Sequence, residues 1–128
     1  MATLRHHVQI TKPADEVWKV VSDPSSVTEW GGVEKCVIGD DGARTISMNG
    51  MEITEAIVTN DADLRRFQYA ITAGPMVPEY HLATVDVIEN GDETLLIYST
   101  EIKPDEAAPI FAGIVKGAAE GIKSYVES

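Results

Sequence analysis

Three side chains with acid–base chemistry lie in strand-like stretches of the sequence: Glu55, Tyr69 and His81. Strand alternation places Glu55 on the same face as Ile53 and Ile57. On an apolar face a carboxylate needs a partner, and burial raises its pKa. We therefore predict that Glu55 faces inward and serves as a polar anchor or a general base.

The opposite orientation of this strand is the alternative. It would turn Thr54, Ala56 and Val58 inward and leave Glu55 in solvent. In that case Glu55 would be an ordinary surface residue with no chemical role.

Aromatic residues in the next strand extend the inward face. Phe67, Tyr69 and Ile71 alternate, so we expect all three to point inward. A buried Tyr69 needs a hydrogen-bond partner for its hydroxyl, and Glu55 is a candidate. Core packing without any ligand contact is the alternative for these aromatic rings.

His81 can face either way in its strand. Ala83 and Val85 favour an inward ring, whereas Leu82 favours the other face. With one ambiguous histidine and no close spacing of ligand-type residues, we expect no metal and no cofactor.

The sequence places no histidine or basic residue beside Cys36, so we expect a packed thiol there. The chain has no G-x-S-x-G, phosphate-binding or dinucleotide motif.

Charge and length narrow the class of protein. The 128 residues carry a net charge of −11, spread along the chain, so we expect neither nucleic acid nor a membrane as partner. There is no apolar run of membrane-spanning length and no signal peptide. The single cysteine, Cys36, cannot form an internal disulfide, which fits a cytoplasmic location. The length suits one domain, residues 1–128, acting as a monomer or homodimer.

Periodicity predicts the elements that position these residues. Residues 3–10 alternate as a strand, and a helix begins near Pro13. Asp23 caps a second short helix, which Gly31-Gly32 ends. Six strand-like stretches joined by hairpin-sized turns, one of them Asn49-Gly50, occupy residues 33–102. Residues 106–127 form one amphipathic helix.

These elements predict an α+β fold in which a curved seven-stranded antiparallel sheet wraps around the C-terminal helix and leaves a space between them. Trp30 would form the floor or rim of this space, or else pack purely in the core. Gly113, Gly117 and Gly121 recur every four residues in the last helix. We predict that they allow close backbone approach, and the alternative is that they enlarge the space beneath the helix.

The order of elements resembles the START-like, Bet v 1-like superfamily with its helix-grip fold. Within it, the chain is most similar to bacterial polyketide cyclase/dehydrase-type SRPBCC proteins. The resemblance rests on "PADEVWKVVSD", "VTEW", Glu55, "NDADLRRFQYAIT", "GPMVPEY", "VDVIENGDETLLIYSTEIKP" and "EGIKSY". One departure is Tyr98, where relatives commonly carry tryptophan, and it adds a hydroxyl to the expected cavity wall.

The resemblance implies a small hydrophobic or aromatic ligand, polyketide- or lipid-like, held in an internal cavity. The wall would consist of Trp30, Phe67, Tyr69, Tyr98, Phe111 and Ile114, with Glu55 as the polar anchor. One alternative is a cyclase or dehydratase that moves protons with Glu55 and Tyr69 or His81. Another is a protein-interaction module with a vestigial cavity, which would expose a large apolar patch.

Overall fold

A computed structural model describes residues 1–128. In chain order the elements are β1 (Ala2–Ile10), α1 (Ala14–Val21), the 3₁₀ turn η1 (Pro24–Ser26), α2 (Val27–Trp30), β2 (Lys35–Ile38), β3 (Arg44–Met48), β4 (Met51–Asp61), β5 (Arg66–Ala73), β6 (Tyr80–Asn90), β7 (Glu93–Lys103), the 3₁₀ turn η2 (Asp105–Ala107) and α3 (Ala108–Glu127). No helix is both long enough and apolar enough to cross a membrane.

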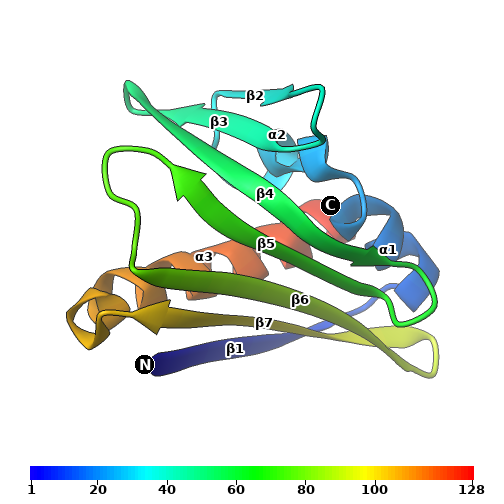
Figure 1. Cartoon of the computed structure of the whole chain (residues 1–128). Helices are drawn as coiled ribbons and strands as arrows, with labels where there is room; N and C mark the ends of the chain where they lie inside the picture. The colour runs from blue at the N-terminus through cyan, green and yellow to red at the C-terminus, as the bar shows by residue number, and fades with distance from the viewer.

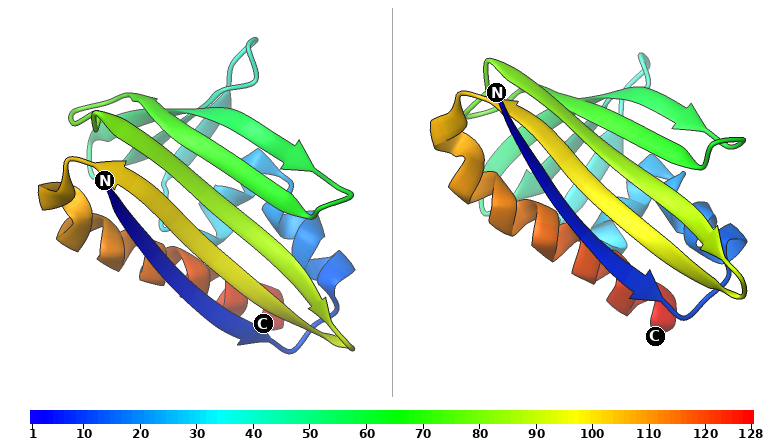
Figure 2. Two further views of the ribbon diagram at one scale, coloured as in Figure 1. Left: turned by 60° about the horizontal axis from the view of Figure 1, so that its bottom comes forward. Right: turned by 90° about the horizontal axis from the view of Figure 1, so that it is seen from below.

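The seven strands form one antiparallel sheet in the order β1-β7-β6-β5-β4-β3-β2. The sheet lies in front of α3 in Figure 1. In the turned views of Figure 2 it curves around that helix. The smaller helices α1 and α2 lie near the C-terminal end of α3 (Figure 1). The predicted helix-grip arrangement is therefore confirmed.

Local signals set the boundaries between these elements. The Asp23 side chain accepts a hydrogen bond from the Ser25 backbone N–H over 3.0 Å, which confirms it as a cap. The predicted second helix is split into η1 and α2. Asn49 and Gly50 have positive φ angles of 52° and 77°, as a two-residue hairpin turn requires.

The main hydrophobic core occupies the end of the sheet that α1 covers. Val17 and Val21 of α1 pack in one cluster with Phe67, Val85 and Val115 from the sheet and α3. Buried side chains of α1, the sheet and α3 occupy this end.

Candidate functional site

A cavity of about 620 Å³ lies between the concave face of the sheet and the first half of α3. Its lining comes from α2, from β3 to β7 and from α3, and 15 of its 24 residues are hydrophobic. This volume and apolar character are typical of sites for small organic molecules. The cavity therefore defines the candidate site.

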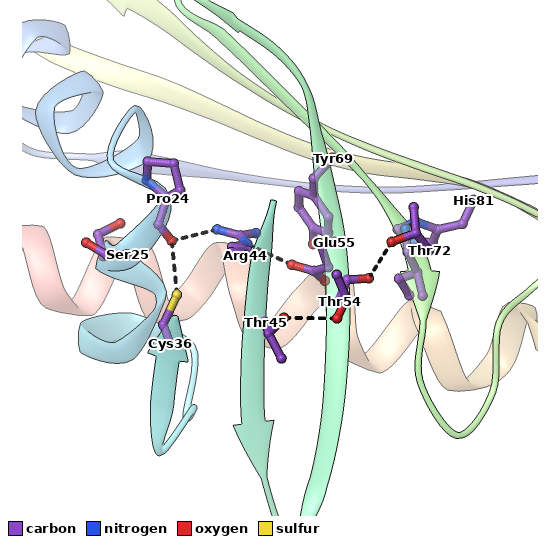
Figure 3. A network of polar contacts seen from close by, with 12 residues as sticks. Pro24, Ser25, Cys36, Arg44, Thr45, Thr54, Glu55, Tyr69, Thr72 and His81 are labelled. Atoms are coloured by element: carbon purple, nitrogen blue, oxygen red, sulfur yellow. Dashed lines mark hydrogen bonds and ion pairs between the residues drawn. The ribbon is translucent and has the colours of Figure 1, made fainter. Parts of the chain in front are cut away.

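A buried ion pair lies in the wall of the cavity. The Asn49-Gly50 turn pairs Arg44 of β3 with Glu55 of β4. Arg44 Nε donates to Glu55 Oε1 over 2.8 Å, and Arg44 Nη1 donates to the Pro24 carbonyl over 2.9 Å (Figure 3). Arg44 is 2% exposed and Glu55 6% exposed. The predicted inward orientation of Glu55 is confirmed.

One oxygen of Glu55 remains available. Burial raises the pKa of Glu55, and the Arg44 charge and hydrogen bond counteract this only in part. Oε2 of Glu55 has no hydrogen bond to the protein. Every fully buried side-chain nitrogen or oxygen in the protein does have a partner, so Oε2 is not fully buried. Oε2 therefore reaches the accessible space of the cavity, where it can accept a hydrogen bond or a proton.

Tyr69 bonds Tyr98, so Glu55, the candidate partner considered from the sequence, does not fill that role. The two hydroxyls are hydrogen-bonded to each other, and both residues line the cavity. Burial raises the pKa of Tyr69 well above its ordinary value and that of Tyr98 to about 12. Both therefore stay protonated at neutral pH. One hydroxyl donates to the other, and the second keeps an O–H that can serve a ligand.

The ring of His81 faces the cavity and is 8% exposed. Its Nδ1 accepts the backbone N–H of Ile71 over 3.1 Å. The ring centroid lies 5.8 Å from that of Tyr69 and 5.5 Å from that of Phe111. Burial lowers the pKa of His81 to about 4, so the ring is neutral at pH 7. The structure thus resolves the ambiguous orientation of His81 in favour of the inward face.

This lowered pKa predicts a pH dependence of stability. Between pH 6.5 and about 4 the unfolded chain protonates His81 while the folded chain does not, so acid destabilises the fold. The slope from this one group is at most about 1.4 kcal/mol per pH unit. His81→Asn keeps an acceptor for Ile71 but has no imidazole to titrate. As the pH is lowered from 6.5 to about 4, the free energy of unfolding of the wild type should therefore fall relative to that of the variant. Urea unfolding across this pH range measures the difference, and parallel curves would contradict the lowered pKa.

Apolar residues surround the mouth of the cavity. Met51 from the tip of the β3–β4 hairpin, Met76 from the β5–β6 loop and Ile110 and Ile114 from α3 all line it and are each more than 40% exposed. The apolar arc of α3 is therefore covered by the sheet only along part of its length. At the mouth of the cavity, Ile110 and Ile114 of this arc are exposed.

Five of the predicted wall residues line the cavity: Trp30, Tyr69, Tyr98, Phe111 and Ile114. Trp30 is half-buried, and its Nε1 donates to Ser26 Oγ over 3.1 Å. Phe67 is not in the lining. It is 2% exposed and belongs to the core cluster beneath α1, because strand alternation gives its face but not its depth.

The glycines of α3 divide into two groups. A Cβ added at Gly121 would overlap the Trp30 carbonyl oxygen, as close packing requires. A Cβ at Gly113 or Gly117 would meet nothing within 4 Å, and both glycines line the cavity. The prediction of close approach is confirmed for Gly121 and wrong for the other two, which leave space at the mouth.

Sequence reasoning missed Arg44. A signal was available, because the Asn49-Gly50 turn joins Met48 to Met51 and thereby sets Arg44 opposite Glu55 four residues farther along each strand. It also missed Thr100, a buried residue of β7 that lines the cavity. No group of three His, Cys, Asp or Glu side chains lies close enough together to hold a metal ion.

Comparison with known proteins gives one family and several structural neighbours. A family described as "Polyketide cyclase / dehydrase and lipid transport" matches residues 1–127. No curated protein matches the chain.

Three solved structures illustrate the similarity of fold. XoxI from Bacillus cereus is 20% identical with a TM-score of 0.89, covering 99% of this chain and 97% of its own. An uncharacterised protein from Bacillus thuringiensis is 18% identical with a TM-score of 0.89, covering 99% and 100%. Norcoclaurine synthase from Thalictrum flavum, in complex with dopamine and hydroxybenzaldehyde, is 22% identical with a TM-score of 0.76, covering 98% and 86%.

Proposed function

The chain belongs to the polyketide cyclase/dehydrase and lipid transport family, and from this we propose that residues 1–128 form one domain that binds a small hydrophobic or aromatic molecule, polyketide- or lipid-like. The observation that carries the proposal is the cavity of about 620 Å³ between sheet and α3. Its mostly apolar wall supplies affinity through the hydrophobic effect. A few inward-facing polar groups supply orientation.

The two ends of the cavity differ in polarity, and this sets how the ligand lies. Met51, Met76 and Ile114 surround the mouth, whereas Glu55 and Tyr98 lie in the buried wall. A ligand with an apolar body and an oxygen at one end would place the oxygen inward and the body toward the mouth. Norcoclaurine synthase, whose structure holds dopamine and hydroxybenzaldehyde, supports the view that this fold accommodates small aromatic molecules.

The proposal predicts that narrowing the mouth weakens binding. Gly117→Leu adds a side chain at a position where a Cβ meets nothing within 4 Å and which lines the cavity. We expect its affinity for any ligand of the wild type to fall by about tenfold or more, about 1.4 kcal/mol. Thermal shift with aromatic, polyketide-like and lipid panels measures this, since a ligand at a hundredfold excess over Kd stabilises the fold by about 2.7 kcal/mol.

Ala112→Leu is the matched control for this experiment. It adds a larger side chain to the same helix at an exposed position outside the cavity lining. It should bind like the wild type. A panel with no hit, or hits that Gly117→Leu leaves unchanged, would contradict the cavity as the binding site and favour the interaction-module alternative.

Proton-transfer catalysis is the second candidate, and the free Oε2 of Glu55 favours it. A buried carboxylate with a raised pKa is a stronger base near neutral pH than an exposed one. The Tyr69–Tyr98 pair has one O–H left to donate. Incubating each ligand of the panel with the protein, followed by liquid chromatography and mass spectrometry, distinguishes the two functions. A carrier returns the ligand unchanged, a cyclase returns an isomer of the same mass with a different retention time, and a dehydratase returns a product lighter by one water.

A further inference from the structure

The hydrogen bonding of His81 fixes the position of its proton. A backbone N–H can only donate, so the ring nitrogen facing Ile71 N at 3.1 Å holds a lone pair and no proton. A neutral imidazole has one N–H, which must then be on Nε2. The low pKa that burial gives His81 is consistent with a neutral ring.

The Nε2–H group opens into the cavity. No protein atom accepts a hydrogen bond from it, and every fully buried side-chain nitrogen or oxygen has a partner. Nε2 therefore reaches accessible space, and His81 is a lining residue whose ring centroid lies 5.8 Å from that of Tyr69 and 5.5 Å from that of Phe111. The site thus presents a fixed donor with two aromatic rings close to it.

The surroundings of this donor favour a neutral acceptor. The only buried cation of the cavity wall, Arg44, is already paired with Glu55, so the site has no spare charge to neutralise an anion. Burying a carboxylate beside an uncharged imidazole and two aromatic rings would be costly. A carbonyl oxygen conjugated to an aromatic ring accepts a hydrogen bond without this penalty.

We propose that His81 is a specificity-determining hydrogen-bond donor, through Nε2–H, for the carbonyl oxygen of a neutral aromatic ketone or aldehyde. The inference rests on the proposed function, because it specifies which small aromatic ligands the cavity prefers. It also assigns His81 a role distinct from that of a general base, since the lone pair of its ring is engaged by Ile71.

Two ligands and two variants test this assignment. The ligands are 2-acetylnaphthalene and 2-ethylnaphthalene, which are similar in size and differ in the carbonyl. His81→Asn keeps an acceptor near the Nδ1 position for Ile71, but its shorter side chain brings no N–H donor to the Nε2 position. His81→Gln is longer and keeps an amide N–H donor near the Nε2 position. Calorimetric titration gives the ratio of the two dissociation constants for each protein, and the solvation difference between the ligands cancels when ratios are compared.

We expect the preference for the ketone over the hydrocarbon to fall by about threefold to tenfold in His81→Asn, the range of one neutral hydrogen bond. His81→Gln should keep most of the preference. Equal ratios in all three proteins would overturn the assignment and leave the proposed function standing. Failure of both ligands to bind the wild type would contradict the proposed function for aromatic ligands, and this inference with it.

A ligand-free measurement tests the proton position directly. Nitrogen-15 NMR of the labelled wild type distinguishes a protonated from an unprotonated ring nitrogen. We expect His81 to carry its proton on Nε2 at pH 7. A proton on Nδ1, or a charged ring, would overturn the assignment whether or not either variant folds, without bearing on the cavity as a binding site.

Discussion

Arg44→Met lowers the free energy of unfolding by about 3–5 kcal/mol, the usual cost of removing one partner from a buried ion pair. The loss leaves Glu55, 6% exposed, without its only cationic partner. It also leaves the Pro24 carbonyl without the Nη1 donor that ties β3 to η1. Urea unfolding at pH 7 measures the effect.

A double-variant cycle identifies the cause. Arg44→Met/Glu55→Met removes both charges, so it should be less destabilised than either single variant. Arg66→Met is the control, because Arg66 bonds Asp86 through Nε and Nη2 at 2.8 and 3.1 Å but is 43% exposed. It should cost no more than about 1 kcal/mol. A loss in Arg44→Met as small as this would contradict the assigned role of the buried pair.

The Arg44→Met variant should also regain stability in acid relative to the wild type, because the acid destabilisation from His81 acts on both proteins. Without the arginine, the pKa of Glu55 rises further above its value in the unfolded chain. The folded state then binds a proton more readily than the unfolded state, so its stability falls as pH rises through that raised pKa and recovers as pH is lowered toward 4.5. A destabilisation caused by the unpaired Glu55 charge should depend on pH in this way, whereas one caused by lost packing should not.

Gly121→Ala is the second change with a large expected effect. The new Cβ would overlap the Trp30 carbonyl oxygen, which is backbone and cannot turn away. Separating α3 from α2 should cost about 1–3 kcal/mol, more than the roughly 1 kcal/mol that alanine gains over glycine in a helix. Thermal unfolding should show a lower Tm than in the wild type.

Gly117→Ala is the matched control on the same helix. A Cβ there meets nothing within 4 Å, so only the helix-propensity gain remains and the variant should be more stable by up to about 1 kcal/mol. The two Gly→Ala changes should therefore shift Tm in opposite directions. Shifts of the same sign and size would contradict the close contact between Gly121 and Trp30.

Most of the fold was predictable because local signals agree with one another. Alternation marked the strands, Asn49-Gly50 marked a hairpin with positive φ at both residues, and the helical periodicity of residues 106–127 marked α3. Antiparallel strands linked by short turns leave few alternative sheet orders. What alternation could not give was the position of the cavity along α3, which depends on where α1 fills the groove.

The site was predictable only in part. The inward face of Glu55 followed from Ile53 and Ile57, and the same hairpin could have given its partner Arg44. The contact between Tyr69 and Tyr98 lay beyond local reasoning, because β6 separates β5 from β7 and the two hydroxyls meet across it.

The two tryptophans allow the most direct test of the binding site. Trp30 lines the cavity, whereas Trp18 packs against the main core and is not part of the lining. Titration of nitrogen-15-labelled protein with 2-acetylnaphthalene, followed by NMR at the two indole N–H signals, reports on both places at once. We predict a saturable shift of the Trp30 signal and little change at Trp18. An unchanged Trp30 signal at a saturating ligand concentration would contradict a binding site between sheet and helix.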